Sequence, residues 1–245
     1  MSAAKPILLI LGSGANIGQG VARAFSAKGY RVAATSRSEK PKQEQVPAYA
    51  IDLHITSDLV DASSILGVFE KVRQALGQAP SVVVYNADDA NKGHSCTTAA
   101  ALTFTPPDDP LALSVEDLNR DFQINTASVL EAAKQAVAGF SSLPAAAAKT
   151  FIYTGNRLTD GPLPGFVDLG IGKSGSAHMI AAASEAYAPK GFRFYFADQR
   201  AADGGKPNLD GAAHGEFYLE LAEGKTNVPW LATFAAGLGY RNFRN

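Results

Sequence analysis

The sequence has little cysteine and no long apolar run. Cys96 is the only cysteine among 245 residues, which excludes an intramolecular disulfide and a cysteine zinc cluster. No apolar run approaches the roughly 18 residues of a membrane span. The run Ile7–Leu11 is also shorter than the roughly 7–15 residues of a signal-peptide core. These absences predict a soluble, cytoplasmic protein without a membrane partner.

Charge is also scarce, and neither sign dominates. Charged residues make up 18% of the chain and the formal net charge is −1. Nucleic-acid-binding proteins usually carry a basic excess, so we expect no nucleic-acid partner. No H-E-x-x-H or paired-carboxylate spacing indicates a metal site. Hydrophobic residues make up 46%, which is enough for a well-filled core.

Short apolar runs alternate with amphipathic segments. The runs read as buried strands and lie at Ile7–Leu11, Tyr30–Thr35, Tyr49–Ile51, Val82–Tyr85, Thr150–Thr154 and Phe192–Ala197. Helical patterns begin at Ile17 and span Asp61–Leu76, about 114–138, about 168–187 and about Ala212–Glu223. Such alternation predicts an α/β fold: one Rossmann-type domain over residues 1–245, with a doubly wound parallel sheet in three αβα layers. Residues 87–113 look like a loop insertion, and 198–245 like a C-terminal segment on the substrate side.

A glycine-rich turn joins the first predicted strand to the first helix. In this context glycines allow a tight turn, and the helix N-terminus offers free N–H groups to an anion. The turn therefore predicts a site for a dinucleotide pyrophosphate. Its candidate residues are Gly12, Ser13, Gly14, Asn16, Ile17 and Gly18.

This turn resembles that of the short-chain dehydrogenase/reductase family, and the resemblance extends over roughly residues 5–196. Family members carry T-G-x-x-x-G-x-G here. Gly12 and Gly18 match, Leu11 replaces the threonine, and Asn16 replaces the middle glycine. Asparagine tolerates unusual backbone angles better than other non-glycine residues, so that replacement is mild.

The end of the second strand indicates which cofactor binds. NAD sites usually place a carboxylate there for the ribose 2′-OH, whereas this chain has Ser36-Arg37. A guanidinium binds a 2′-phosphate well, and the resemblance implies NADP for members with an arginine at this place. We therefore expect NADP(H).

Two further cofactor contacts are implied by the resemblance. Asp52-Leu53 is taken to follow the third strand, where the aspartate would bind the adenine amino group. Asn86-Ala87 follows the fourth strand and matches the family's N-A-G beside the cofactor ribose, except that the glycine is Asp88.

The catalytic positions match the family only in part. The family uses an Asn, a Ser and a Y-x-x-x-K pair, in which the tyrosine gives a proton to the substrate oxygen. Asn125 and Lys173 match, and Lys173 would also bind the nicotinamide ribose. Leu169 stands at the tyrosine position, and either Asn156 or Gly155 aligns with the serine. The chain therefore resembles a divergent member that lacks the catalytic Ser and Tyr.

Several acids could replace the tyrosine. Asp168 is next to Leu169 and is a catalytic candidate, although an aspartate at a helix start is more often an N-cap. Asp160 and Asp198 are expected beyond strand ends, where parallel sheets bind ligands.

Three functions remain open. The first is an atypical NADP(H)-dependent oxidoreductase that reduces a carbonyl or imine of a small organic molecule, with a substituted proton donor. The others are a non-redox isomerase or cyclase on the same scaffold, and an inactive NADP(H)-binding regulator. The resemblance also implies a homodimer or homotetramer, and an exposed face with Gly172, Gly175 and Ala177 would permit close packing.

Overall fold

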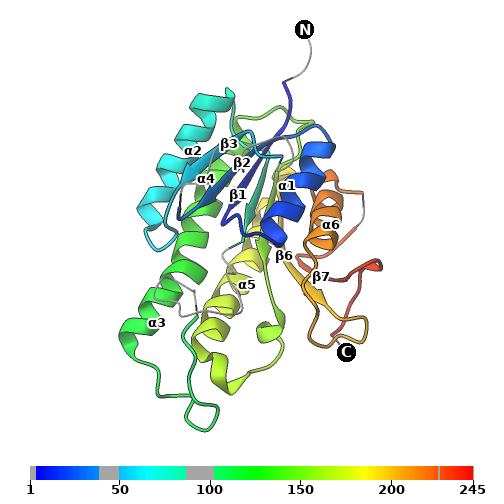
Figure 1. Ribbon diagram of the computed structural model, residues 1–245. Coiled ribbons are helices and arrows are strands. Elements are labelled where there is room, and N and C mark those ends of the chain that lie inside the picture. The colour runs from blue at the N-terminus through cyan, green and yellow to red at the C-terminus, as the bar shows by residue number, and fades with distance from the viewer. Residues whose placement is uncertain (1–3, 39–49, 87–101, 226, 245) are drawn as a thin grey trace.

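The computed structural model describes residues 4–38, 50–86, 102–225 and 227–244. Its described strands form one sheet in the order β3-β2-β1-β4-β5-β6-β7-β8 (Figure 1). All neighbours are parallel except β7 and β8. The strands are β1 Ile7–Leu11, β2 Arg31–Ser36, β3 Leu53–Thr56, β4 Val82–Tyr85, β5 Thr150–Thr154, β6 Arg193–Arg200, β7 Leu231–Ala235 and β8 Gly239–Tyr240. The predicted α/β fold is confirmed.

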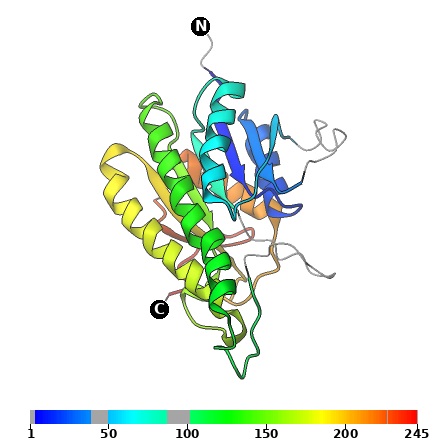
Figure 2. The ribbon, with the colours of Figure 1, turned by 90° about the vertical axis from the view of Figure 1, so that its left-hand side faces the viewer.

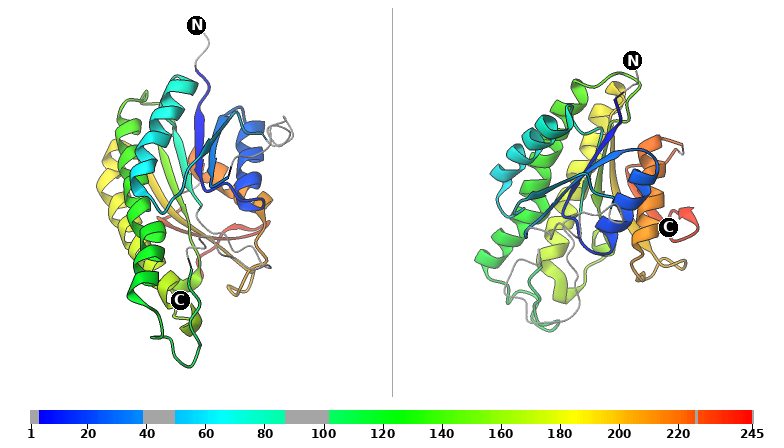
Figure 3. Two further views of the ribbon diagram at one scale, coloured as in Figure 1. Left: turned by 60° about the vertical axis from the view of Figure 1, so that its left-hand side comes forward. Right: turned by 45° about the horizontal axis from the view of Figure 1, so that its top comes forward.

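Helices cover both faces of the sheet, which gives the expected three layers (Figures 1 and 2). One buried apolar cluster joins the sheet to α2 (Ala62–Leu76), α4 (Ser128–Ser141) and α5 (Val167–Tyr187). A second joins the opposite face to α1 (Ile17–Ala27) and α6 (Gly211–Glu223), which lie side by side in Figure 3. None of the described helices is long and apolar enough to cross a membrane.

The strand predictions differ in accuracy. The predictions for β1, β4 and β5 match the structure to the residue. The third strand was placed wrongly, because β3 is Leu53–Thr56 rather than Tyr49–Ile51. Strands β7 and β8 were missed in the 198–245 segment. Of the predicted loop insertion, residues 102–113 carry no helix or strand, and 87–101 lie outside the described residues.

The helix predicted over 114–138 is three consecutive helical segments. α3 (Val115–Phe122) runs into a π-turn, η3 (Gln123–Ala127), and then into α4. A π-turn changes the regular i→i−4 pairing and often marks a functional position. Here the carbonyl of Asn125 accepts hydrogen bonds from Tyr153 Oη at 3.2 Å and from Ser176 Oγ at 2.5 Å. The π-turn is therefore tied to β5 and α5.

The small residues of α5 face the interior of the chain, contrary to the prediction. A Cβ on Gly172 would lie 2.5 Å from Asn125 Cβ, and one on Gly175 would lie 3.4 Å from Thr126. Ala177 is only 6% exposed, within the core. These residues let α5 approach η3 closely and are not free for contact with another subunit.

Asp168 is not the N-cap of α5. Phe166 holds that position, and Asp168 lies in the first turn with no exposed surface. Its Oδ2 accepts the Thr103 N–H at 2.6 Å, while Thr103 Oγ1 donates to Asp121 Oδ2 at 2.7 Å. Burial, and then hydrogen bonding to the neighbouring Asp121 carboxyl, raise the pKa of Asp168 to about 6. The two carboxyls therefore form a buried pair that joins α3, α5 and Thr103.

This pair predicts a particular pH dependence of stability. Because the folded state raises the pKa of Asp168, its contribution to stability is full below about pH 4 and is lost as pH rises through about 6. Two pKa units correspond to at most about 3 kcal/mol. In Asp168→Asn the amide can accept from Thr103 and donate to Asp121. We expect the variant to gain stability relative to the wild type between pH 5 and 8 in chemical denaturation.

Asp109→Asn is the matched control, because it makes the same change at an exposed carboxyl. Its stability difference from the wild type is expected to stay constant over the same pH range. If the Asp168→Asn difference were equally constant, the folded protein would not hold a proton on this pair.

Candidate functional site

The turn between β1 and α1 depends on close contacts at its glycines. Gly12 has a φ of +88° and donates its N–H to Thr35 Oγ1 at 3.1 Å. A Cβ on Gly18 would lie 2.7 Å from Ser13 Cα, so a larger residue there would push α1 away from the turn. A Cβ built on Gly14 would meet none of the other described residues within 4 Å, so that side of the turn is open.

The first turn of α1 is suited to an anion. Asn16 is its N-cap residue, but the Asn16 side chain makes no capping hydrogen bond, and the first turn contains no acidic residue. The first N–H groups of a helix have no partner within the helix and lie at its positive end. A pyrophosphate group fits this turn because these donors and the open side at Gly14 lie together.

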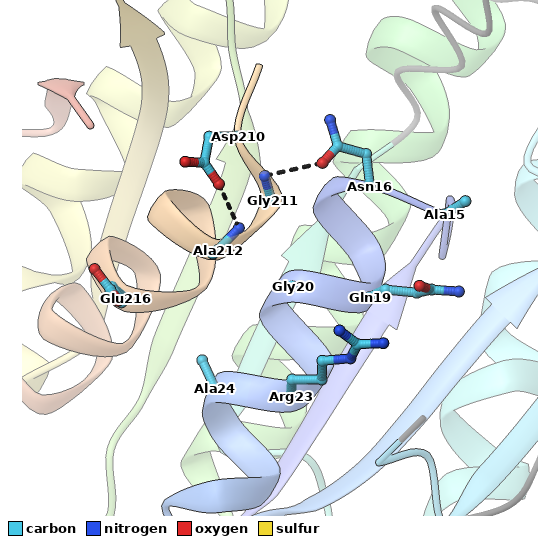
Figure 4. Close-up of a pocket in the computed structure, with 10 residues that line it drawn as sticks. All are labelled: Ala15, Asn16, Gln19, Gly20, Arg23, Ala24, Asp210, Gly211, Ala212 and Glu216. Carbon is cyan, nitrogen blue, oxygen red and sulfur yellow. Dashed lines mark hydrogen bonds between the residues drawn. The ribbon is translucent and has the colours of Figure 1, made fainter. Parts of the chain in front are cut away.

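The Asn16 side chain instead reaches the beginning of α6. Its Nδ2 donates to the Leu209 carbonyl at 2.9 Å. Its Oδ1 accepts the Gly211 N–H, also at 2.9 Å (Figure 4). A surface pocket of about 480 Å³ lies beside these contacts, over α1 and α6. Asn16 thus connects the turn to a segment almost 200 residues further along the chain.

Ser36 and Arg37 lie at the carboxyl end of β2, as expected. The Ser36 hydroxyl is 2.7 Å from His54 Nε2 on β3 and donates to the Ser38 carbonyl at 2.9 Å. Arg37, directly after the strand, is exposed. The structure therefore places an exposed arginine at the carboxyl edge of the sheet, next to a serine held by the neighbouring strand.

The placement of Asp52-Leu53 was wrong. Leu53 begins β3, so Asp52 precedes the strand. The Asp52 carboxylate accepts the Val32 N–H at 2.7 Å, early in β2. The carboxyl edge of the sheet lies four residues further on, about 13 Å away at 3.3 Å per residue. Asp52 supports the start of two strands and does not face the cofactor edge.

Another Asp–Leu pair occupies the position that was expected for Asp52-Leu53. Asp58-Leu59 follows β3 after a single residue, Ser57, and the Asp58 carboxylate accepts the Val60 N–H at 3.0 Å. Asp61 is the N-cap of α2, and this cap could have located the Asp58-Leu59 pair from the sequence. Because the helix starts at Ala62, the loop that follows the third strand must lie shortly before residue 61.

Asn86 joins β4 to the phosphate turn. Its Nδ2 donates to the Gly12 carbonyl at 2.9 Å, and its backbone N–H donates to Leu11. The residue is 4% exposed, and its Oδ1 has no hydrogen-bond partner among the described residues. An unsatisfied buried acceptor beside the turn fits a ligand that donates a hydrogen bond. Ala87 lies outside the described residues.

Lys173 is buried at the carboxyl end of β5. It is 1% exposed, its Nζ donates to the Thr154 carbonyl at 3.0 Å, and it lies 4.5 Å from the centre of the Tyr153 ring. Leu169, one helical turn earlier, is also buried. A buried ammonium group requires such partners, so Lys173 is not an ordinary surface lysine of α5.

The structure brings Asn125 close to this lysine. Tyr153 places its ring beside Lys173 and donates its hydroxyl to the Asn125 carbonyl. Asn125 has no exposed surface, and its Nδ2 donates to the Asp121 carbonyl at 3.1 Å. Asn125 and Lys173, both predicted from the resemblance, therefore belong to one group of contacts.

Asn156 and Asp168 lie in other surroundings. The Asn156 side chain accepts the Leu158 N–H and caps a short helix, η4 (Arg157–Thr159). Asp168 is five residues before Lys173, which is about 140° around a helix with 3.6 residues per turn. It faces Thr103 and Asp121. Neither side chain is directed at Lys173 by these contacts.

An ion-pair network at β6 was not predicted. Asp198 was expected beyond the sixth strand, but β6 continues to Arg200 and contains it. Asp198 Oδ2 accepts from Arg200 Nε at 2.5 Å, and Arg200 also contacts Asp160 Oδ2 at 2.6 Å. Arg244, near the C-terminus, pairs with the other Asp160 oxygen at 2.7 Å. The four side chains, Asp198, Arg200, Asp160 and Arg244, are called the β6 ion network.

Asp198 belongs electrostatically to the Lys173 site. Burial raises the pKa of Asp198 to about 6, against the opposing effect of Arg200. The charge of Asp160 raises the pKa further, and that of Lys173 lowers it. Lys173 and Asp198 therefore influence each other's charge at the carboxyl edge. Among the described residues, no group of three His, Cys, Asp or Glu side chains is placed to hold a metal ion.

Comparisons with known proteins agree with this geometry. No family model matches the chain. A curated protein, "Short chain dehydrogenase/reductase dmxR12" from Cryptosporiopsis sp. (strain 8999), is 46% identical over 242 residues, 98% of this chain and 95% of that protein.

Two solved structures illustrate the shared fold. BdcA in complex with NADPH has a TM-score of 0.70 at 18% identity, covering 97% of this chain and 96% of that one. The NADH-dependent reductase A1-R′ complexed with NAD has a TM-score of 0.76 at 14% identity, covering 94% of each chain. Neighbours with this fold thus bind nicotinamide cofactors of both kinds. With the 46% identical relative, the fold and the turn establish that this chain belongs to the short-chain dehydrogenase/reductase family.

Proposed function

We propose that the protein is an NADP(H)-dependent reductase that acts on a carbonyl or imine carbon of a small organic molecule. The observation that carries the proposal is the buried Lys173, held by Thr154 and Tyr153 at the same sheet edge as the open turn at Gly14. Ligands of doubly wound sheets bind at this edge.

The chain offers a series of cofactor contacts along this edge. The turn from Gly12 to Gly18 would hold the pyrophosphate, and Arg37 the 2′-phosphate. Asp58 would bind the adenine amino group, the contact that was first expected of Asp52. Asn86 and Ala87 would contact the ribose near the turn, and Lys173 the nicotinamide ribose. The cofactor, when bound, supplies a hydride to the substrate carbon.

The proton is the unusual part of the proposed reaction. Leu169, at the position where the family places its tyrosine, has no proton to donate, and we propose that the catalytic serine and tyrosine are both absent. A carbonyl would need a proton from water or from another side chain. An iminium carbon accepts hydride without a new proton on its nitrogen. The substrate class therefore includes iminium ions, and imines that take a proton from water before the hydride is transferred.

The first test is turnover. With carbonyl and imine panels, we expect NADPH to be oxidised in a one-to-one ratio with product. Lys173→Met keeps the length of the side chain but removes the charge that would bind the nicotinamide ribose, and should lower kcat/KM roughly 10- to 100-fold. Thermal unfolding of the variant serves as the control for folding. Product formed without net NADPH oxidation would identify the isomerase or cyclase alternative, and NADPH binding without any product would favour the regulator.

The second test is cofactor preference. Charge-assisted hydrogen bonds to a phosphate contribute roughly 1.5–3 kcal/mol, so Arg37→Ala should weaken NADPH binding by roughly 10- to 100-fold and leave NADH binding nearly unchanged. Arg73→Ala removes the same charge from the exposed last turn of α2 and serves as the control. Unchanged NADPH preference in Arg37→Ala would remove the 2′-phosphate role.

We also propose a homodimer or homotetramer, formed through the helices α3 to α5. Apolar side chains on these helices are exposed: Phe122 (40%), Leu130 (49%) and Ile171 (44%). Burial of such groups is a common driving force for association. Light scattering should give a dimer or tetramer mass for the wild type and a lower mass for Leu130→Arg. Leu66→Arg, on the exposed side of α2, should leave the mass unchanged. A monomeric wild type would contradict the proposal.

A further inference from the structure

Asn16 uses both ends of its side-chain amide to hold a distant segment. Its Nδ2 donates to Leu209 and its Oδ1 accepts from Gly211. Figure 4 shows the amide directed from the first turn of α1 toward the beginning of α6. Asn16 has a negative φ of −99°, so it does not adopt the left-handed backbone conformation that favours glycine or asparagine.

The contact between α1 and α6 is too close for either helix to shift without moving the other. A Cβ on Gly211 would lie 2.2 Å from the Asn16 carbonyl oxygen. A Cβ added to Gly20 would lie 1.9 Å from the Gly211 carbonyl oxygen. A Cβ added to Gly215 would lie 2.5 Å from the Gly20 carbonyl oxygen. Closely packed elements of this kind transmit displacements rather than absorb them. A shift of the first turn of α1 must therefore move the beginning of α6.

The segment that leads into α6 is held at its other side by Gln199 of β6. Gln199 Oε1 accepts the Asp210 N–H at 3.0 Å, and its Nε2 donates to the Asn208 carbonyl at 3.3 Å. Residues 201–210 between these contacts are mostly exposed. They leave the carboxyl end of β6 directly after Arg200, at the sheet edge where ligands of parallel sheets bind.

We infer that Asn16 is a positioning residue that couples cofactor binding at the phosphate turn to the conformation of residues 201–211. The inference rests on the proposed function, since the occupant of the turn is taken to be NADPH. A dinucleotide bound to the N–H groups of the first turn fixes the backbone at Asn16, and the Asn16 amide then fixes Leu209 and Gly211. Coupling of this kind is reciprocal, so a substrate that orders residues 201–211 would also strengthen NADPH binding.

Hydrogen exchange of the full-length protein tests the coupling directly. Peptides covering 201–213 are measured without NADPH and with enough NADPH to saturate each variant, as established by fluorescence titration. In the wild type we expect NADPH to slow exchange in these peptides by roughly 5-fold or more. In Asn16→Gly, which restores the glycine of the family pattern, most of this slowing should disappear at the same saturation.

Gln199→Ala is the matched control. It removes the other anchor of the segment without touching the phosphate turn, so exchange without NADPH should rise while the slowing caused by NADPH remains. A purely structural role of Asn16 would instead raise exchange equally with and without NADPH. That result would overturn the inference but not the proposed function. The same holds if the wild type binds NADPH and hydrogen exchange in residues 201–213 does not slow. Failure of the wild type to bind NADPH in the titration would overturn both the proposed function and this inference.

Discussion

The charge of one buried ammonium group determines much of the arrangement at the carboxyl edge. Lys173 has almost no exposed surface, and a buried cation is costly unless polar groups compensate it. Thr154 supplies a carbonyl, Tyr153 an aromatic face, and Asp198 a carboxylate within electrostatic range. Asp198 is itself buried and needs Arg200, which needs Asp160. The β6 ion network therefore extends from Asp198, which is within electrostatic range of the buried lysine, to Arg244 at the surface.

This dependence explains why β6 is longer than expected. An apolar run predicts only the apolar part of a strand, so the prediction stopped at Ala197, although the polar residues Asp198, Gln199 and Arg200 are buried as well. In the structure those charged residues continue the strand because their partners are supplied by distant segments, the loop that contains Asp160 and the C-terminal Arg244. Ion pairs between remote residues cannot be read from local spacing, so Asp198 and Arg200 were not recognised as one network.

Other predictions succeeded or failed according to whether neighbouring or distant residues determine the local structure. β1 and β5 were predicted to the residue because continuous apolar runs are buried on both faces. β3 was misplaced because its sequence, Leu-His-Ile-Thr, alternates and is only partly buried. The cap prediction for Asp168 used a sound local rule but failed because Asp121 and Thr103, far away in the sequence, bind its carboxyl group. The resemblance located Lys173 and Asn125, and the structure brings them together through Tyr153.

The charges around Lys173 bear on the source of the proton in the proposed reaction. The β6 ion network already holds two cations, Arg200 and Arg244, and two carboxylates, Asp198 and Asp160. The Asp198 carboxylate lies within electrostatic range of Lys173 and favours its charged form. The contacts of Lys173 with Thr154 and Tyr153 also stabilise its charged form. A lysine held in its charged form is a poor proton donor and Leu169 has no proton to donate, so for the proposed reductase we expect the proton of a carbonyl reduction to come from water or from another side chain.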